Sequence, residues 1–362
     1  MKYVTYVGAT TSPAQPIGIH ILESDAETGD FKILRAIDAG ANNTYMALTR
    51  DCRRLYTVTG RPGFGGKGAD GGLAAYTVQG DELKPINCVP TGHTVPCHVS
   101  LSPDEKTLVW AEYSHATAGS VELAPDGSIT AAKQMVQHVG DGPNKPRQDK
   151  AHAHCAVVTP DSKYLLVVDL GIDQIKAYDF QNRAGGLREC PEATIHTVPP
   201  GAGPRHVIFQ KDGRIMYVIF ELTTLVASYR YDGRRFEYIE TRRLIADQAV
   251  NRDCKASAIK LSADGTQLFC SNRDCSNKAR DSITVYNIDP ASGRMEFLAE
   301  SPVGDIFPRD FEFMPGEKFA LVGFERTGRV GSFAYDRRTG KFTRVKTMEG
   351  FGQPLYFRFK TV

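Results

Sequence analysis

The chain has 362 residues, of which 41% are apolar and 24% are charged, so it has an ordinary globular composition and can bury a substantial core. Its net charge of +2 provides no overall field that would attract nucleic acid or a membrane surface, and we expect neither partner. The eight cysteines form no CxxC pair, the start of the chain lacks the apolar core of a secretion signal, and no apolar run is long enough to span a membrane. We therefore expect a cytoplasmic protein with reduced thiols.

The first predicted element is an alternating strand at Tyr3–Gly8, which reads as a second strand without its first. Six similar units follow, and each contains a strand, a polar turn and a second strand rich in Leu, Val, Tyr and Phe. The residues that mark these turns lie 51 to 57 positions apart: Asp51, Asp104, Asp161, Asp212, Asp264 and Gly316. A fixed period near 50 residues with several strands per unit is typical of a β-propeller.

Each unit continues with a third strand, such as Gln174–Phe180 or Ser282–Ile288, and then with a fourth. The last predicted strand, Gln353–Phe359, reads as an inner strand without its partner. Pairing it with Tyr3–Gly8 completes a seventh blade and closes the ring, which removes exposed sheet edges. We therefore predict one all-β domain over residues 1–362, a seven-bladed propeller with four antiparallel strands per blade. The glycine-rich segment Gly60–Gly72 lacks the spacing of a phosphate-binding loop, and we interpret it as a flexible connection between strands.

Spacing from the turn markers predicts which side chains meet. In a blade, the start of the first strand and the end of the second lie on the same face, opposite the turn. Seven positions before and nine positions after the markers give one group that should surround one mouth of the central axis: Thr44, Cys97, His154, Arg205, Ser257, Arg309, Gly60, Tyr113, Leu170, Glu221, Arg273 and Glu325. Polar and ionisable residues dominate this group, as expected for a site on a rigid β scaffold.

The residue types in this group suit acid–base chemistry on a small anion. Arginines bind carboxylate or phosphate through their planar fork, and His154 can exchange a proton near neutral pH. Nearby positive charge should keep Glu221 ionised. We predict that His154 or Glu221 acts as the general base or acid, with Arg205 and Arg273 stabilising developing negative charge.

The histidine doublet His152 and His154 is open to a second interpretation as a metal pair. A metal site needs three or four ligands, and the neighbouring arginines repel cations, so we expect neither a metal nor a cofactor. Cys155 should point to the other side of its strand, and no G-x-S-x-G elbow occurs, so we do not expect a covalent nucleophile. Six further residues are predicted to bind substrate: Arg309, Arg147, His98, His152, Tyr113 and Glu325.

Several segments resemble the lactonase family of seven-bladed propellers, which includes propeller-type 6-phosphogluconolactonases and fungal 3-carboxy-cis,cis-muconate lactonizing enzymes. The resemblance covers essentially the whole chain, and its most specific parts are Gly142–Ile175 and Gly201–Phe209. Pro96–Asp104, Cys270–Arg273 and Phe307–Phe311 support it. It implies a metal-free active site formed by His154, Arg205, Glu221 and Arg273, the residues that the spacing had already brought together.

Three hypotheses for the function follow. The first is a lactonase that hydrolyses a small anionic sugar-acid lactone, above all 6-phosphogluconolactone. The second is a cycloisomerase of the carboxymuconate type, which would use the same groups. The third is a propeller that only binds other proteins, because a fold does not dictate a function. The enzyme hypotheses require Arg205 and Arg273 to point toward each other. In either case we expect a monomer or a weak homo-oligomer.

Overall fold

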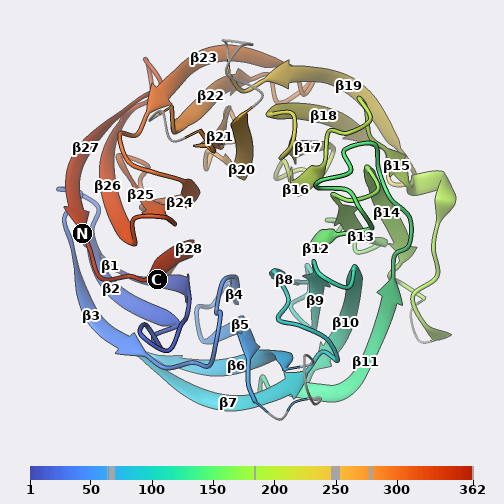
Figure 1. Ribbon diagram of the computed structural model, residues 1–362, viewed down its shortest axis with the longest axis horizontal. Helices are drawn as coiled ribbons and strands as arrows, with labels where there is room; N and C mark the ends of the chain where they lie inside the picture. Colours follow the sequence, from blue (N-terminus) through green and yellow to red (C-terminus); the bar gives the residue numbers. More distant parts are fainter. Residues whose placement is uncertain (63, 65–69, 183–184, 246–252, 277–279, 361–362) are drawn as a thin grey trace.

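The computed structural model describes residues 1–362 except 63, 65–69, 183–184, 246–252, 277–279 and 361–362. Seven four-stranded antiparallel sheets stand in a ring around a central axis, as Figure 1 shows. The predicted all-β, seven-bladed propeller is therefore confirmed. A short 3-10 helix, η2 (Pro191–Ala193), precedes the outer strand of one blade.

Each sheet begins with an inner strand beside the axis and ends with an outer strand (Figure 1). The inner strands are β28 (Gln353–Lys360), β4 (Met46–Leu48), β8 (His98–Leu101), β12 (Ala153–Val158), β16 (Pro204–Phe209), β20 (Cys254–Leu261) and β24 (Pro308–Phe313). The second strands are β1 (Lys2–Thr10), β5 (Arg54–Gly60), β9 (Thr107–Glu112), β13 (Tyr164–Asp169), β17 (Ile215–Phe220), β21 (Gln267–Asp274) and β25 (Phe319–Phe324).

The third strands are β2 (Ile19–Asp25), β6 (Gly71–Gln79), β10 (Thr117–Leu123), β14 (Gln174–Asp179), β18 (Leu225–Tyr231), β22 (Ser282–Ile288) and β26 (Arg329–Asp336). The outer strands are β3 (Phe31–Ile37), β7 (Glu82–Pro90), β11 (Ile129–Gln137), β15 (Ile195–His196), β19 (Phe236–Arg243), β23 (Met295–Pro302) and β27 (Lys341–Met348).

The ends of the chain close the ring as predicted. Strand β28 pairs antiparallel with β1, with Val7 opposite Phe357, and the sheet order is β28-β1-β2-β3. The termini therefore lie in the same blade (Figure 1).

The turn markers of the sequence form repeated hydrogen-bonded turns between the first and second strands. In one of them, Thr159 Oγ1 donates to Asp161 Oδ1 at 2.6 Å, and the backbone N–H of Lys163 donates to the same oxygen at 3.1 Å. Ser102 with Asp104 and Ser262 with Asp264 repeat the first contact at 2.6 and 2.7 Å. Local side-chain hydrogen bonds of this kind stabilise tight turns, which explains why these residues recur with the blade period.

The core lies between neighbouring blades. All residues of β9, β13 and β17 are buried, as expected for strands covered on both faces by adjacent sheets. One representative layer joins Leu166 and Val168 of β13 to Met216 and Val218 of β17. The predicted connection Gly60–Gly72 does run between two strands, β5 and β6. Its residues 63 and 65–69 lie outside the described residues, so its flexibility stays a prediction.

Candidate active site

Bulges in the inner strands position the predicted site residues. In β12, Ala153 pairs with Asp169 and Cys155 pairs with Val168, which leaves His154 as the extra residue. Arg205 is the extra residue in β16, and Arg309 is the extra residue in β24. A bulge bends its strand and re-aims a side chain, and bulges are common next to active sites. The same local irregularity therefore recurs at the same end of three inner strands.

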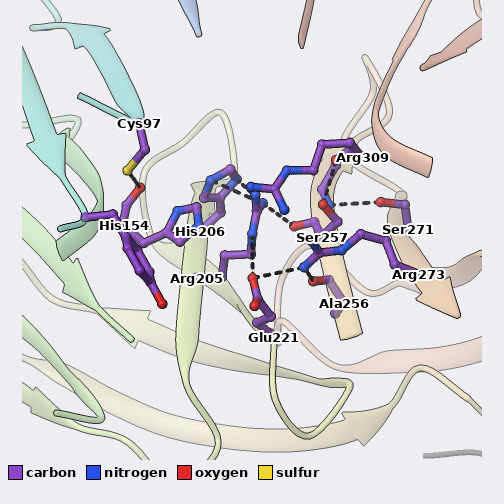
Figure 2. Close-up of polar contacts among 12 residues, drawn as sticks. Cys97, His154, Arg205, His206, Glu221, Ala256, Ser257, Ser271, Arg273 and Arg309 are labelled. Atoms are coloured by element: carbon purple, nitrogen blue, oxygen red, sulfur yellow. Dashed lines mark hydrogen bonds and ion pairs between the residues drawn. The ribbon is translucent and has the colours of Figure 1, made fainter. Parts of the chain in front are cut away.

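Glu221, which directly follows β17, is the centre of the charged group (Figure 2). Its Oε2 atom accepts from Arg205 Nε at 3.2 Å and lies 2.9 Å from an Nη atom of Arg273. Its Oε1 atom accepts from Arg147 at 2.7 Å. Glu221, Arg205 and Arg273 are each 3% exposed, so these ion pairs are shielded from water. Arg205 and Arg273 thus converge on one carboxylate oxygen.

The start of β20 holds two of these arginines in place through its backbone. Arg205 donates to the carbonyl oxygen of Ser257 at 2.8 Å, and Arg273 donates to that of Ala256 at 2.8 Å (Figure 2). The N–H of Ala256 in turn donates to the backbone oxygen of Glu221 at 3.1 Å. The guanidinium groups are therefore fixed before any ligand binds, which is the preorganisation that electrostatic catalysis requires.

The same contacts set the charge of Glu221. Burial alone would raise the pKa of the Glu221 carboxyl, but the charges of Arg273, Arg205 and Arg147 hold it well below its usual range. Glu221 is therefore ionised at neutral pH, and both of its oxygens are already occupied by guanidinium groups. A carboxylate in this state is a weak base and has no proton to donate.

Unlike Glu221, His154 is uncharged at neutral pH. Burial, followed by the charges of Arg205 and Arg309, lowers the pKa of its imidazole well below the usual value, so the ring is neutral at pH 7. Its buried Nδ1 atom has no hydrogen-bond partner among the described residues. A neutral imidazole with an unpaired nitrogen can accept a proton, so His154 is the better base of the two candidates.

Arg309 and Glu325 are two further members of the charged group around Glu221. Arg309 Nε lies 3.9 Å from Glu325 Oε2, which is too long for a hydrogen bond. Glu325 Oε2 and Arg273 Nε join His154 Nδ1 among the buried polar atoms without a partner in the described ranges. Leaving such atoms unsatisfied costs about 1–3 kcal/mol each, so a bound polar ligand or water is expected here.

The side of the site next to His154 is aromatic. The ring of Tyr113 stacks on His152 at 4.2 Å between centroids and meets His154 edge-on at 5.7 Å. Both nitrogens of His152 are engaged, one with the backbone oxygen of Tyr113 and one with Asp149, each at 3.0 Å. Strand β12 begins at Ala153, so His152 lies just before the strand and His154 lies within it. The two histidines are therefore not equivalent.

His98, a predicted substrate ligand, lies elsewhere. It belongs to a layer of aromatic rings across the axis that also contains Tyr45, His206 and Tyr356. His98 and His206 line a cavity of about 840 Å³ on the turn side of this layer, away from Glu221.

The charges near this cavity are mutually neutralised, since Lys260 pairs with Asp310 at 3.3 Å and with Glu312 at 3.0 Å. Three charged or imidazole side chains with a buried unpaired atom, those of His154, Arg273 and Glu325, lie on the other side, and we place the candidate site there.

The cysteines near His154 are not activated. Burial raises the pKa of both Cys97 and Cys155 to about 12, so both remain thiols at neutral pH. Cys155 Sγ lies 3.4 Å from His98 Nε2 and lines the cavity on the turn side. In the part of the chain that the structure describes, no group of three or more His, Cys, Asp or Glu side chains is arranged to hold a metal ion. Metal-free chemistry remains a prediction.

Sequence reasoning missed two residues of this region. His206 lies 5.2 Å from the ring of His154, and Arg205 Nη1 is 3.3 Å from its ring nitrogens. Strict alternation along a strand would place the side chains of residues 205 and 206 on opposite faces, but the bulge at Arg205 interrupts this alternation. Lys255 of β20, the register partner of Arg273, is the other missed residue. The sequence could have indicated Lys255, because it lies two residues before Ser257, a member of the group predicted from spacing.

The fold and the charged group together define a class: a seven-bladed propeller with a preorganised cationic site at one end of its axis. The sequence profile of the family described as "Lactonase, 7-bladed beta-propeller" matches residues 4–359. The chain belongs to this family, as its resemblance to the family predicted.

Individual relatives align over nearly their full length. A protein named 6-phosphogluconolactonase from Bacillus subtilis (strain 168) is 31% identical over 362 residues, covering 99% of this chain and 98% of that protein. Another of the same name from Formosa agariphila is 26% identical and covers 94% of each chain. The solved structure of the periplasmic gluconolactonase of Pseudomonas aeruginosa matches with a TM-score of 0.89 and 31% identity over 100% of both chains. These names support a lactonase-type enzyme.

The described residues include no helix that is both long enough and apolar enough to cross a membrane.

Proposed function

We propose that this protein hydrolyses a small anionic sugar-acid lactone, most specifically 6-phosphogluconolactone. The observation that carries the proposal is the pairing of a neutral, unpartnered His154 with a preorganised cluster of arginines around Glu221. A lactone is an activated ester, so one positioned base and one site for the oxyanion suffice for its hydrolysis. The names of the relatives from Bacillus subtilis and Formosa agariphila support the choice of substrate.

In the proposed mechanism, His154 takes a proton from a water molecule as the water oxygen attacks the lactone carbonyl carbon. The carbonyl oxygen becomes negatively charged in the tetrahedral intermediate, and Arg205 and Arg309, which both act electrostatically on His154, stabilise that charge. The intermediate collapses as the ring C–O bond breaks, and His154 returns the proton to the leaving alkoxide oxygen. The product is the open hydroxy acid.

Glu221 has a different role in this proposal. Its two oxygens hold Arg147, Arg205 and Arg273, so it acts as a positioning residue that fixes the guanidinium groups. Of the remaining predicted ligands, Arg147, Tyr113, Arg309 and Glu325 surround this group, and His152 supports Tyr113 from behind. His98 belongs to the aromatic layer and lines the cavity on its turn side, so its role as a substrate ligand finds no support in the geometry.

The alternatives are less well supported. A carboxymuconate-type cycloisomerase would use the same side chains, but no observation favours it over hydrolysis, and both named relatives are lactonases. A purely protein-binding propeller does not require Arg205 and Arg273 to converge, whereas both contact Glu221 Oε2. We also propose a reducing compartment such as the cytoplasm, since all eight cysteines are free thiols, and a monomer or weak homo-oligomer.

The test is hydrolysis of freshly generated 6-phosphogluconolactone by purified protein, after subtraction of the spontaneous rate. His154→Asn should lower kcat by about 10²–10⁴-fold, because it removes the general base. The exposed His196 provides the matched control, and His196→Asn should behave like the wild type. Equal rates for the wild type and His154→Asn would refute the proposal. Loss of the ultraviolet absorbance of 3-carboxy-cis,cis-muconate would instead identify the cycloisomerase.

A further inference from the structure

The candidate site holds more positive charge than Glu221 can neutralise. Two carboxylates, Glu221 and Glu325, face a larger group of cations among the described residues: Arg147, Arg205, Arg273, Arg309 and Lys255. An excess of positive charge in a partly buried site is unfavourable unless a ligand brings negative charge. An unphosphorylated sugar lactone is neutral and would not supply it.

Among the described residues, Lys255 is a cation of the site without an ion-pair partner. It is the register partner of Arg273 across β20 and β21, so the two side chains lie on the same face of that sheet. It is only partly buried, and no carboxylate in the described part of the chain forms an ion pair with it. Its electrostatic neighbours are Arg147, Cys275, Glu221 and Arg273.

Lys255 lies beside Arg273, its register partner, whereas His154 lies beside Tyr113 and His206. The charges that act on His154 are those of Arg205, Glu221 and Arg309, whereas those that act on Lys255 include Arg147 and Arg273. Glu221 is common to both groups. A substrate with its lactone carbonyl at His154 would therefore extend its other end toward Lys255 and Arg147.

We propose that Lys255 and Arg147 form a subsite for a phosphomonoester and give the enzyme its preference for phosphorylated over unphosphorylated lactones. This inference rests on the proposed function and specifies its substrate class. A phosphomonoester carries a charge close to −2 at pH 7 and has three acceptor oxygens. Lysine binds phosphate as a compact charge, and Arg147, whose side chain is 29% exposed, presents donors toward the same region.

The protonation of Lys255 agrees with this role. Burial and the nearby charge of Arg147 lower the pKa of its ammonium group in the free protein. A dianionic phosphate placed between the two cations would oppose the effect of Arg147, so ligand binding should raise the pKa of Lys255. A lysine that only supports the fold would show no such change.

Binding of the open product acids tests the subsite without any need for turnover. Calorimetric dissociation constants for 6-phosphogluconate and for gluconate give the phosphate preference of each variant. Lys255→Met should lower the ratio of the two affinities by about tenfold or more, since it removes a charge-assisted hydrogen bond to phosphate. Lys255→Arg should retain most of the ratio. Lys211→Met, an exposed lysine in a turn on the opposite face, is the matched control.

Three results would overturn the subsite: an equal loss of affinity for both acids in Lys255→Met, no loss for either, or no preference for 6-phosphogluconate in the wild type. If the preference depends on Lys255 but the wild type does not hydrolyse the lactone, the proposed function fails and the subsite stands. If hydrolysis occurs but the ratio does not depend on Lys255, only the subsite fails.

Discussion

At the scale of single residues, His154 is acted on by charges of opposite sign. Arg309 lowers the pKa of its imidazole, and Glu221 raises it, although burial has the largest effect. If His154 is the general base, activity requires its neutral form. The rate should then stay constant as the pH falls through 6.5, the usual pKa of histidine, and decline only at lower pH.

Two variants should shift the pH at which the rate declines on the acid side, and they should shift it in opposite directions. Arg309→Met removes a positive charge and should shift the limb of the pH profile of kcat/KM upward. Glu221→Gln removes a negative charge and should shift it downward, besides lowering the rate through its effect on the arginines. The profiles, measured with the spontaneous rate subtracted, give the pKa of the free enzyme. Shifts in the same direction, or none, would show that another group titrates.

The residue scale also shows what sequence spacing can and cannot predict. Offsets from the turn markers predicted that Arg205, Glu221 and Arg273 would meet, because each blade repeats the same path. They did not predict that His206 would also lie at the axis, because a bulge adds one residue to a strand and leaves no periodic signal. The ionisation of Glu221 was predictable from its neighbours. The unpaired state of His154 was not, since it depends on packing.

At the scale of elements, the turns after the inner strands share a strained position. In the five turns marked by an aspartate, the residue that follows it has a positive φ, including Ser162 at 60° and Gly265 at 72°. A side chain in this region costs about 1–2 kcal/mol, which glycine avoids. Where Ser162 and Glu105 take this position, the aspartate and its hydrogen-bonded Thr or Ser compensate for this cost. The sequence predicted the position of each turn, and the backbone geometry explains why an aspartate recurs in it.

Ser162→Gly should therefore stabilise the protein by about 0.5–1 kcal/mol, because relief of the strain exceeds the added freedom of the unfolded chain. The reverse substitution, Gly265→Ala, should destabilise it by about 1 kcal/mol or more, since its Cβ would also lie 2.5 Å from the Gln210 side chain. Urea unfolding of both variants measures these changes. Destabilisation by Ser162→Gly would show that the strain is absent or that the Ser162 side chain is needed.

At the scale of the whole molecule, the propeller buries ionisable groups around its axis as well as apolar residues between its blades. Burial lowers the pKa of four histidines: His20, His98, His154 and His206. For His20 and His98 the values fall to about 4 and about 3. In the unfolded chain all four titrate near pH 6.5. Below that pH the unfolded state binds protons that the folded state excludes, so these histidines make stability fall as the pH falls.

Each of these histidines contributes up to about 1.4 kcal/mol per pH unit between pH 6.5 and its lower folded pKa. Buried carboxyls oppose the trend, as Asp281 does with a pKa raised by burial to about 6, because they bind a proton in the folded state first. The dependence of the free energy of unfolding on pH is therefore a sum of opposing contributions. A single variant isolates one of them.

His206→Gln removes one partly buried histidine whose pKa is lowered by burial and by Arg205. The free energy of unfolding of this variant should decline less between pH 6.5 and 5 than that of the wild type, by up to about 1.4 kcal/mol per pH unit, whatever its stability at pH 7. Urea unfolding at several pH values gives both slopes, with the exposed His196→Gln as the control. Parallel slopes for the wild type and His206→Gln would mean that His206 takes up its proton in the folded ring, and that the axis admits charge more readily than its burial implies.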